Sequence, residues 1–208
     1  MIINPHEYAE SFISEDAVKQ AARARGVEIG THDVSPGTGA YLRHLAQLLS
    51  AQSVVEIGTG SGVGSLWLLE GMIKSGTLTS IDDEMEHSSI AKIAFTDAQI
   101  AAPRYRLITN SVMDVMTKLA DRAYDLVVFR HNPEDLSFAI TEAHRILRSG
   151  GVFVIDNFFG GSKVPDPAQR DPKTIALREA GKAIKADSES WMSALITTGD
   201  GLLLATKL

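Results

Sequence analysis

The stretch that decides the fold is Val54-Val55-Glu56-Ile57-Gly58-Thr59-Gly60-Ser61-Gly62-Val63-Gly64-Ser65, followed by the apolar run from Leu66 to Ile73. The β-branched residues before the glycines predict a buried strand, and the apolar run after them predicts a helix. Glycines at such a turn let the backbone bend sharply and come close to a ligand, and free N–H groups point at it. We therefore expect a cofactor site here, rather than only a tight turn.

Four further short apolar segments predict strands, with helical periodicity between them. With Ser53–Ile57, the predicted strands are Thr77–Ile81, Tyr105–Thr109, Asp125–Phe129 and Val152–Ile155. The helix between the fourth and fifth strands is expected to begin near Pro133 and to end at Ser149-Gly150-Gly151. Alternating strands and helices predict an α/β fold, a Rossmann-like doubly wound sheet with helices on both faces.

The two ends of the chain extend this pattern. The turn signal Thr198-Gly199-Asp200-Gly201 separates Trp191–Thr197 from Leu202–Thr206, which predicts an antiparallel C-terminal hairpin. Leucines at helical spacing between residues 41 and 49 predict a helix before the first strand. We expect one domain over residues 1–208, with residues 1–50 as a helical cover and residues 51–208 as the Rossmann-like core.

Composition disfavours several classes of protein. The net charge of −6 opposes attraction to a phosphate backbone, so we do not expect a nucleic-acid partner. The absence of cysteine excludes disulfides, thiolate zinc sites and a cysteine nucleophile. No apolar run reaches the length of a membrane span, and the first residues lack the pattern of a signal peptide. We expect a cytoplasmic protein without a membrane partner.

The acidic residues around the glycine turn indicate which cofactor binds. Asp82 follows the second predicted strand, roughly 20 residues beyond the turn, where a carboxylate can accept hydrogen bonds from both ribose hydroxyls. The dinucleotide pattern G-x-G-x-x-G is incomplete, because its third glycine is replaced by Val63 or Ser65 in the two possible frames. Glu56 suits a ligand with a cationic amino-acid end. S-adenosylmethionine is therefore favoured over NAD.

These residues resemble motif I of the class I S-adenosylmethionine-dependent O-methyltransferases, specifically the catechol and caffeoyl-CoA O-methyltransferase group. The resemblance includes Val34-Ser35-Pro36, Thr79-Ser80-Ile81-Asp82, Tyr124–Val127, Leu147–Gly151, Asp156-Asn157 and Gly199–Leu202. It implies a seven-stranded sheet with an antiparallel last strand and, commonly, a homodimer. It also implies contacts to the cofactor: Val34, Glu56, Gly58, Thr59 and Ser65 at the methionine part, Asp82 at the ribose, Asp83 beside it and Val112 at the adenine, with Gly60 and Gly64 in the same turn.

The sequence departs from this family at the metal site. Members typically hold a divalent cation with an Asp after the fourth strand and an Asp-Asn pair after the fifth, and carry a Lys near the first Asp. Asp156 and Asn157 supply the pair and are expected to line the substrate pocket. Arg130 stands at the position of the first Asp, however, and Pro133 at that of the Lys. Because a cation beside a dication is unfavourable, we do not predict a metal.

Arg130 and His131 are the candidate catalytic residues. The Arg130 guanidinium would stabilise an acceptor phenolate or bind a substrate carboxylate; the alternative is a structural salt bridge to Asp156. His131 would act as a general base, and the alternative is a loop histidine without a chemical role. The Gly- and Pro-rich segment Phe158–Pro167 would form a flap over the acceptor, or an ordinary connecting loop.

The sequence thus predicts an enzyme that transfers a methyl group from S-adenosylmethionine to the hydroxyl of a small aromatic acceptor. Two alternatives stay open at this stage. One is a protein that binds S-adenosylmethionine without transferase activity, suggested by the missing Asp and Lys. The other is an NAD-dependent oxidoreductase.

Overall fold

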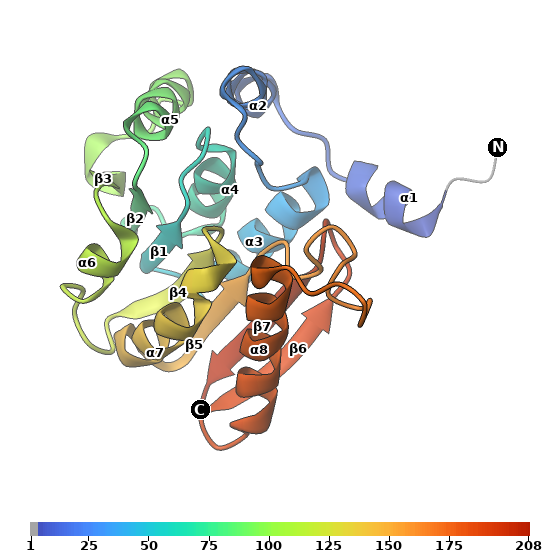
Figure 1. The fold of residues 1–208 in the computed structure, drawn as a ribbon. Helices are drawn as coiled ribbons and strands as arrows, with labels where there is room; N and C mark the ends of the chain where they lie inside the picture. Colours follow the sequence, from blue (N-terminus) through green and yellow to red (C-terminus); the bar gives the residue numbers. More distant parts are fainter. Residues whose placement is uncertain (1–3) are drawn as a thin grey trace.

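The computed structural model describes residues 4–208 and has the predicted alternation of strands and helices (Figure 1). The strands are β1 (Ser53–Ile57), β2 (Thr77–Asp82), β3 (Tyr105–Thr109), β4 (Tyr124–Phe129), β5 (Leu147–Ile155), β6 (Trp191–Ile196) and β7 (Leu202–Lys207). The helices are α1 (Pro5–Ser11), α2 (Ala17–Ile29), α3 (Pro36–Leu48), α4 (Val63–Gly71), α5 (Met85–Asp97), α6 (Val112–Met116), α7 (Leu136–Ile146) and α8 (Pro172–Ala186), with 3-10 turns η1 (Ala102–Arg104) and η2 (Pro133–Asp135).

All seven strands form one sheet in the order β3-β2-β1-β4-β5-β7-β6. Strands β1 to β5 are parallel, whereas β7 pairs antiparallel with both β5 and β6. This confirms the predicted Rossmann-like sheet with its antiparallel C-terminal hairpin. The strand order reverses between β1 and β4, which is where open α/β sheets bind their ligands.

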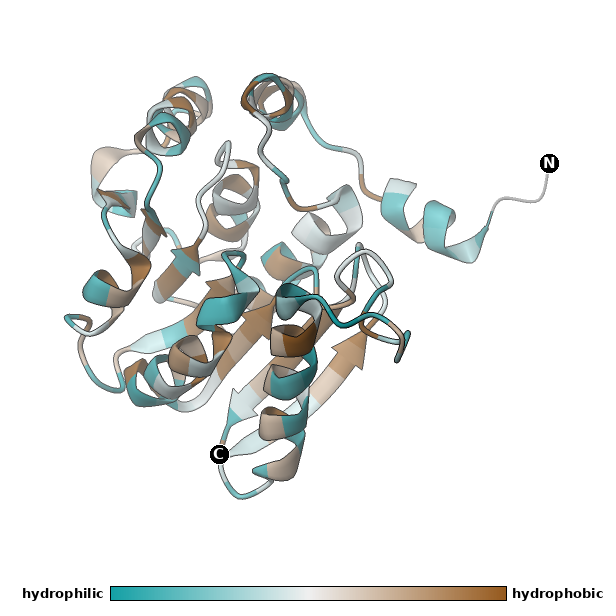
Figure 2. Ribbon diagram, viewed as in Figure 1, coloured by the Kyte–Doolittle hydropathy of each residue, from teal (hydrophilic) through white to brown (hydrophobic). Residues whose placement is uncertain are grey.

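Alternate residues of the central strands pack into two apolar cores, one on each face of the sheet. Figure 2 shows these strands in the colour of hydrophobic residues. On one face, Val55, Ile57 and Phe129 pack with residues of α6, α7 and α8. On the other face, Val54 and Leu126 pack with residues of α2, α3, α4 and α5. The central strands are therefore buried on both sides, and their carboxyl ends are the part left available for a site.

One predicted boundary is wrong. Helix α7 ends at Ile146, and β5 already begins at Leu147 instead of Val152. Leu147 pairs with Tyr124, and the register shifts before Val152 pairs with Leu126. The Ser-Gly-Gly sequence that resembles a helix stop therefore forms an irregularity within the strand, because glycine permits the left-handed conformation found at Gly150 (φ 77°).

The N-terminal helices are fastened to the C-terminal turn through Glu10. Its carboxylate accepts hydrogen bonds from the N–H groups of Gly199 (2.7 Å) and Gly37 (2.9 Å) and from the hydroxyl of Thr198 (3.0 Å). Burial alone would raise the pKa of Glu10, but hydrogen bonds from these groups and Ser35 outweigh it and lower the pKa. No helix within residues 4–208 has the length and apolar character needed to cross a membrane.

Candidate active site

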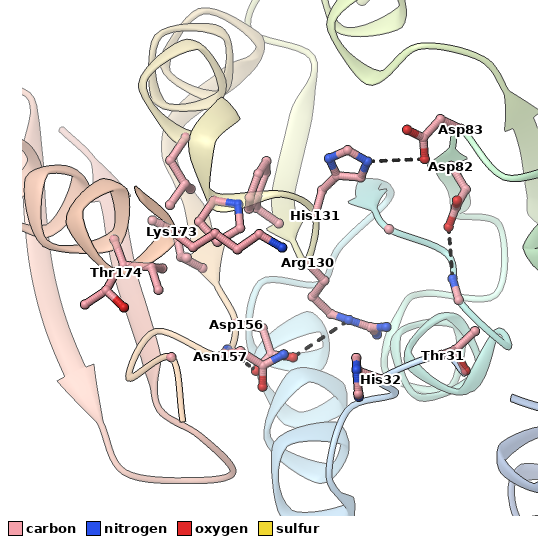
Figure 3. A pocket seen from close by; sticks show the side chains of 18 of the residues that line it. Thr31, His32, Asp82, Asp83, Arg130, His131, Asp156, Asn157, Lys173 and Thr174 are labelled. Atoms are coloured by element: carbon pink, nitrogen blue, oxygen red, sulfur yellow. Dashed lines mark hydrogen bonds and ion pairs between the residues drawn. The ribbon is translucent and has the colours of Figure 1, made fainter. Parts of the chain in front are cut away.

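A pocket of about 450 Å³ opens at the carboxyl edge of the sheet, where β1, β2, β4 and β5 end side by side. Ile57 pairs with both Ile81 and Phe129, and Phe129 pairs with Ile155. This register lines up the polar residues at the strand ends: Gly58, Asp82, Arg130 and Asp156 all line the pocket. Figure 3 shows the Arg130 guanidinium near the middle of this row.

The glycine turn is shaped by how closely other groups approach it. Gly58 has φ 92°, and a Cβ there would lie 2.3 Å from the carbonyl oxygen of Arg130. A Cβ on Gly64 would lie 2.3 Å from Nη1 of Arg130 and 2.6 Å from Oε1 of Glu56. These positions require glycine, because neighbouring groups leave no room for a side chain there, and Gly58 and Gly60 line the pocket with their backbone. This is a cradle that fits a nucleoside cofactor.

Asp82 holds this cradle together from the end of β2. Its Oδ2 accepts a hydrogen bond from the N–H of Gly60 (3.1 Å), while its Oδ1 lies 3.0 Å from Nδ1 of His87. Asp33 supports the other side of the turn by accepting from the N–H of Ser61 (3.2 Å) and from its hydroxyl (2.7 Å). The Asp82 carboxylate is thereby oriented at the sheet edge, as binding of ribose hydroxyls requires.

Glu56 lies fully buried behind the glycine turn. Its Oε2 accepts hydrogen bonds from the hydroxyls of Ser80 (2.8 Å) and Ser65, whereas Oε1 accepts none from the described residues. Burial raises the pKa of Glu56, although the nearby Arg130 guanidinium opposes the shift. A buried acceptor without a hydrogen bond fits a ligand's ammonium group, which matches the cationic end of S-adenosylmethionine.

The Arg130 guanidinium lies between two buried carboxylates. Its Nη1 is 3.6 Å from Oε1 of Glu56, and its Nε is 3.8 Å from Oδ2 of Asp156. The Arg130 side chain is only 4% exposed, yet Nε and Nη1 donate no hydrogen bond within residues 4–208. The salt bridge to Asp156 is therefore present as an ion pair, and both Nε and Nη1 lie close to a carboxylate without forming a hydrogen bond to it. Burial raises the pKa of Asp156, with Arg130 again opposing the shift.

This arrangement does not fit a divalent cation. A dication beside Asp156 would meet the positive charge of Arg130, which already lies 3.8 Å from that carboxylate. Within the described part of the chain, no three His, Asp or Glu side chains are grouped so that they could hold a metal ion. We therefore derive no step through a metal.

His131 connects two acidic side chains at the rim of the pocket. Its Nε2 lies 3.3 Å from Oδ1 of Asp83 (Figure 3), and its Nδ1 lies 3.3 Å from Oδ2 of Asp135. A general base needs a ring nitrogen that faces the acceptor. Both nitrogens of His131 face carboxylates instead, so this geometry favours a part in the pocket wall.

The predicted site residues fall into two groups. Those that line the pocket are Gly58, Gly60, Asp82, Asp83, Arg130, His131, Asp156 and Asn157. Those that lie behind it or beside it are Val34, Glu56, Thr59, Gly64, Ser65 and Val112, all of them buried. Asn157 has φ 53°, a left-handed conformation that is uncommon outside glycine and that clusters at functional sites.

The pocket also contains residues that the sequence analysis missed. They come from the loop after α2, from the start of α7, and from the first turns of α8: Thr31, His32, Leu136, Lys173, Thr174 and Leu177. Of the expected flap, Gly160 and Lys163 line the pocket. Phe158 is buried in the core, and a Cβ on Gly201 would lie 2.6 Å from the Phe159 ring. The two aromatic rings of that segment therefore serve packing.

The same segment is held down by Arg178 of α8. Its guanidinium donates hydrogen bonds to the carbonyl oxygens of Val164 (2.9 Å), Lys163 (2.9 Å) and Gln169 (2.5 Å), and also to that of Asp166. One half-buried side chain with four carbonyl partners thus holds a loop that has little secondary structure of its own.

Comparison with known proteins identifies the family of this chain. The model of the O-methyltransferase family matches residues 6–208. The chain belongs to this family. Relatives that are O-methyltransferases by name include proteins of Mycobacterium sp. (strain KMS), 47% identical, and Mycobacterium marinum, 46% identical; each match spans 96% of this chain and 90% or 89% of the relative.

Solved structures show the same fold. A Corynebacterium glutamicum protein is 32% identical, with a TM-score of 0.88 over 96% of this chain and 94% of its own. The O-methyltransferase TomG from Streptomyces achromogenes, involved in tomaymycin synthesis and solved in complex with S-adenosylmethionine, is 26% identical, with a TM-score of 0.86 over 96% and 93%. The chain is thus an S-adenosylmethionine-dependent O-methyltransferase of the class I fold, and the alternative of an NAD-dependent oxidoreductase is wrong.

Proposed function

We propose that this enzyme methylates the hydroxyl of a small aromatic acceptor that binds between Arg130 and the apolar wall of α7 and α8. One observation carries the proposal: two donors of a nine-tenths buried guanidinium have no hydrogen-bond partner where the glycine turn meets the open half of the pocket. A phenolate oxygen placed there would accept charge-assisted hydrogen bonds from the guanidinium, which would stabilise its negative charge when it attacks the methyl group.

The cofactor half of the site would be formed by the predicted residues. Gly58, Gly60 and Gly64 provide the backbone cradle, and Asp82 accepts hydrogen bonds from the ribose hydroxyls. The free Oε1 of Glu56 faces the ammonium group. The methionine part of S-adenosylmethionine would be surrounded by Val34, Thr59 and Ser65. Its nucleoside part would lie beside Asp83 and Val112. S-adenosylmethionine supplies an already activated methyl group, so the chain has mainly to align the acceptor.

In the acceptor half, Arg130 would stabilise the oxyanion while Asp156 accepts the proton of the hydroxyl. The new bond joins the acceptor oxygen to the methyl carbon, as the bond from that carbon to sulfur breaks and its electron pair stays on sulfur. Asp156 suits the role of base because its Oδ2 accepts no hydrogen bond from residues 4–208 and burial raises its pKa. Asn157 would help to orient the acceptor. A base role for His131 has less support, because both of its nitrogens face carboxylates.

We also propose a homodimer in the cytoplasm. Strand β6 is one of the two edge strands of the sheet, and it exposes Met192 (62%) and Leu195 (49%). Apolar side chains on an edge strand favour contact with a second copy. Light scattering on the purified protein and on a Met192→Lys/Leu195→Lys variant tests this: we expect a dimer that the variant loses, and a monomeric wild type would contradict it.

The activity is tested by transfer of a radiolabelled methyl group from S-adenosylmethionine to a panel of catechols and phenols, with and without magnesium. We expect labelled methyl ethers and S-adenosylhomocysteine in equal amounts, at rates that magnesium and chelators leave unchanged. Tight cofactor binding without transfer to any acceptor would instead support a binding protein without transferase activity. A strict requirement for magnesium would contradict the role given to Arg130.

A further inference from the structure

Lys173 is the lysine of the pocket wall that has no carboxylate partner among residues 4–208. The carboxylates of the pocket wall each lie within 4.0 Å of a basic side chain already. Their pairs are Asp82 with His87 (3.0 Å), Asp83 with His131 (3.3 Å), Asp156 with Arg130 (3.8 Å) and Asp171 with Lys163 (4.0 Å). No ion pair or hydrogen bond of Lys173 is formed within the described residues. Its charge is thus left for something that the chain itself does not provide.

The direction of the side chain makes this charge part of the site. Figure 3 shows Lys173 extending from the start of α8 across the pocket toward Arg130. A lysine in the first turn of a helix is disfavoured by the positive end of the helix dipole. The helix is already capped by Asp171, whose carboxylate accepts from the N–H of Thr174 (3.1 Å). Stability of α8 therefore gives no reason for a lysine at this position, whereas binding of an anion does.

The residues around Lys173 indicate what kind of molecule would carry the anionic group. Pro133, Leu136 and Leu177 line the same half of the pocket and offer an apolar wall for a ring or short chain. At the other end of this wall, Arg130 has free donors on a side chain that is 4% exposed. The pocket thus has an apolar middle between two cationic groups, one buried and one exposed. A ligand that matches it has an apolar body with an anionic group at one end and an oxygen that becomes negative at the other.

We propose that the methyl acceptor is a hydroxylated aromatic carboxylate, whose carboxylate Lys173 binds while its hydroxyl faces Arg130. A carboxylate is favoured over a phosphate because one lysine is left to neutralise one negative charge. The inference rests on the proposed function for its hydroxyl end, but its carboxylate end can be measured without turnover. Lys173 then acts as a specificity-determining residue that does not touch the reacting atoms.

The test uses matched probes that differ only in charge. 3,4-Dihydroxybenzoate and 3,4-dihydroxybenzamide have nearly the same shape, and both are assayed as acceptors with wild type, Lys173→Met, Lys173→Arg and Lys182→Met. The last variant is the control, because Lys182 lies on the same helix and pairs with Glu179 (2.8 Å) away from the pocket. Binding of both probes to the complex with S-adenosylhomocysteine is measured by calorimetry in parallel.

We expect the wild type to prefer the benzoate by about tenfold in kcat/KM and in affinity, as a charge-assisted hydrogen bond would give. In Lys173→Met, kcat/KM and affinity for the benzoate should fall to the values for the benzamide, while the values for the benzamide stay unchanged. Lys173→Arg should retain most of the preference for the benzoate, and Lys182→Met should retain all of it. Equal use of the two probes by wild type, binding of neither, or an equal loss for both in Lys173→Met would overturn the inference. A Lys173-dependent binding preference without any methyl transfer would uphold the inference and count against the proposed function.

Discussion

The two halves of the pocket are built in different ways. The cofactor half is made of backbone and short side chains that follow β1 and β2 directly, and the hydrogen bonds from Gly60 to Asp82 and from Ser61 to Asp33 hold them in place before any ligand arrives. The acceptor half is assembled from long side chains on separate elements, among them Arg130 after β4 and Lys173 on α8. Strand register fixes the first half and also places Arg130 and Asp156 of the second, whereas the packing of α8 and its preceding loop fixes the rest of the second half.

This difference suggests how one fold serves many acceptors. A cradle made of backbone cannot change without disturbing the sheet, since its positions are set by the ladder that joins β1, β2 and β4. Side chains on α8 can change without altering any strand pairing. We therefore expect substitutions in the cofactor half to damage folding and binding together, and substitutions in the acceptor half to affect turnover or selectivity separately.

The largest effect is expected for Gly58→Ala in the cofactor half. The new Cβ would lie 2.3 Å from the backbone oxygen of Arg130, and φ is 92°. We expect the free energy of unfolding to fall by about 3 kcal/mol and the binding of S-adenosylmethionine to be lost. Chemical denaturation and calorimetry measure the two effects.

Gly161→Ala is the matched control for this prediction. Gly161 also has a positive φ, 68°, but no heavy atom lies within 4 Å of the position of its Cβ. Its replacement should cost about 1 kcal/mol of strain and leave cofactor binding unchanged. If the two variants behaved alike, close approach at the glycine turn would not be what Gly58 provides.

A large but purely catalytic effect is expected for Asp156→Asn. The amide keeps the shape but cannot accept the proton, so kcat should fall about 100-fold while the affinity for S-adenosylmethionine stays the same. Because burial raises the pKa of Asp156, the acidic limb of the wild-type pH-rate profile should lie above the usual range of an aspartate and disappear in the variant. Asp166→Asn is the control, because Asp166 lies in the exposed part of the loop that joins β5 to α8. It should keep both the wild-type kcat and the acidic limb of the pH-rate profile.

A moderate effect is expected for Arg178→Met. Loss of its hydrogen bonds to the carbonyl oxygens of residues 163 to 169 should loosen the segment that carries Gly160 and Lys163 into the pocket. KM for the acceptor should rise about fivefold, with faster amide exchange in that segment and unchanged cofactor binding. Exchange that stays as slow as in wild type would mean that Phe158 packing alone holds the segment.

The smallest effect is expected for Glu10→Gln, which does not line the pocket. The pKa of Glu10 is lowered in the folded chain, so its stabilisation is fully present above the ordinary value of 4.5 and is lost as pH falls through the folded pKa. At pH 7 the variant should be less stable by about 1 kcal/mol, and the difference should shrink as the pH falls below 4.5 and through the folded pKa. Thermal unfolding measured from pH 7 down into this range tests this, with the exposed Glu7→Gln as control.

The same contrast explains what the sequence could predict. Strands such as Ser53–Ile57 were predicted correctly because each is a short apolar run between clear turn signals. The glycines, Glu56 and Asp82 belong to contiguous motifs, so their positions follow from the strand that precedes them. Ser149-Gly150 was misassigned because the residues that stop a helix also permit an irregular strand, and local pattern does not separate the two.

The acceptor half was less predictable because its residues meet only in the folded chain. Helix α8 was not predicted at all, although Asp171 as a cap and Leu177, Ala180 and Ile184 at helical spacing were available signals. Lys173 at its start looks like an ordinary solvent-facing lysine in the sequence. Asp33 gave no signal of its own, since its partner Ser61 lies 28 positions away.

The central claim is that Arg130 serves the acceptor and not the cofactor, and one comparison tests it most directly. Dissociation constants for S-adenosylmethionine and kcat are measured for wild type and Arg130→Met under identical conditions. The account predicts a fall in kcat of about 100-fold, with cofactor affinity changed less than about threefold or tightened, because the cation beside Glu56 is removed. A loss of cofactor affinity as large as the loss of kcat would contradict it and place Arg130 in the cofactor half.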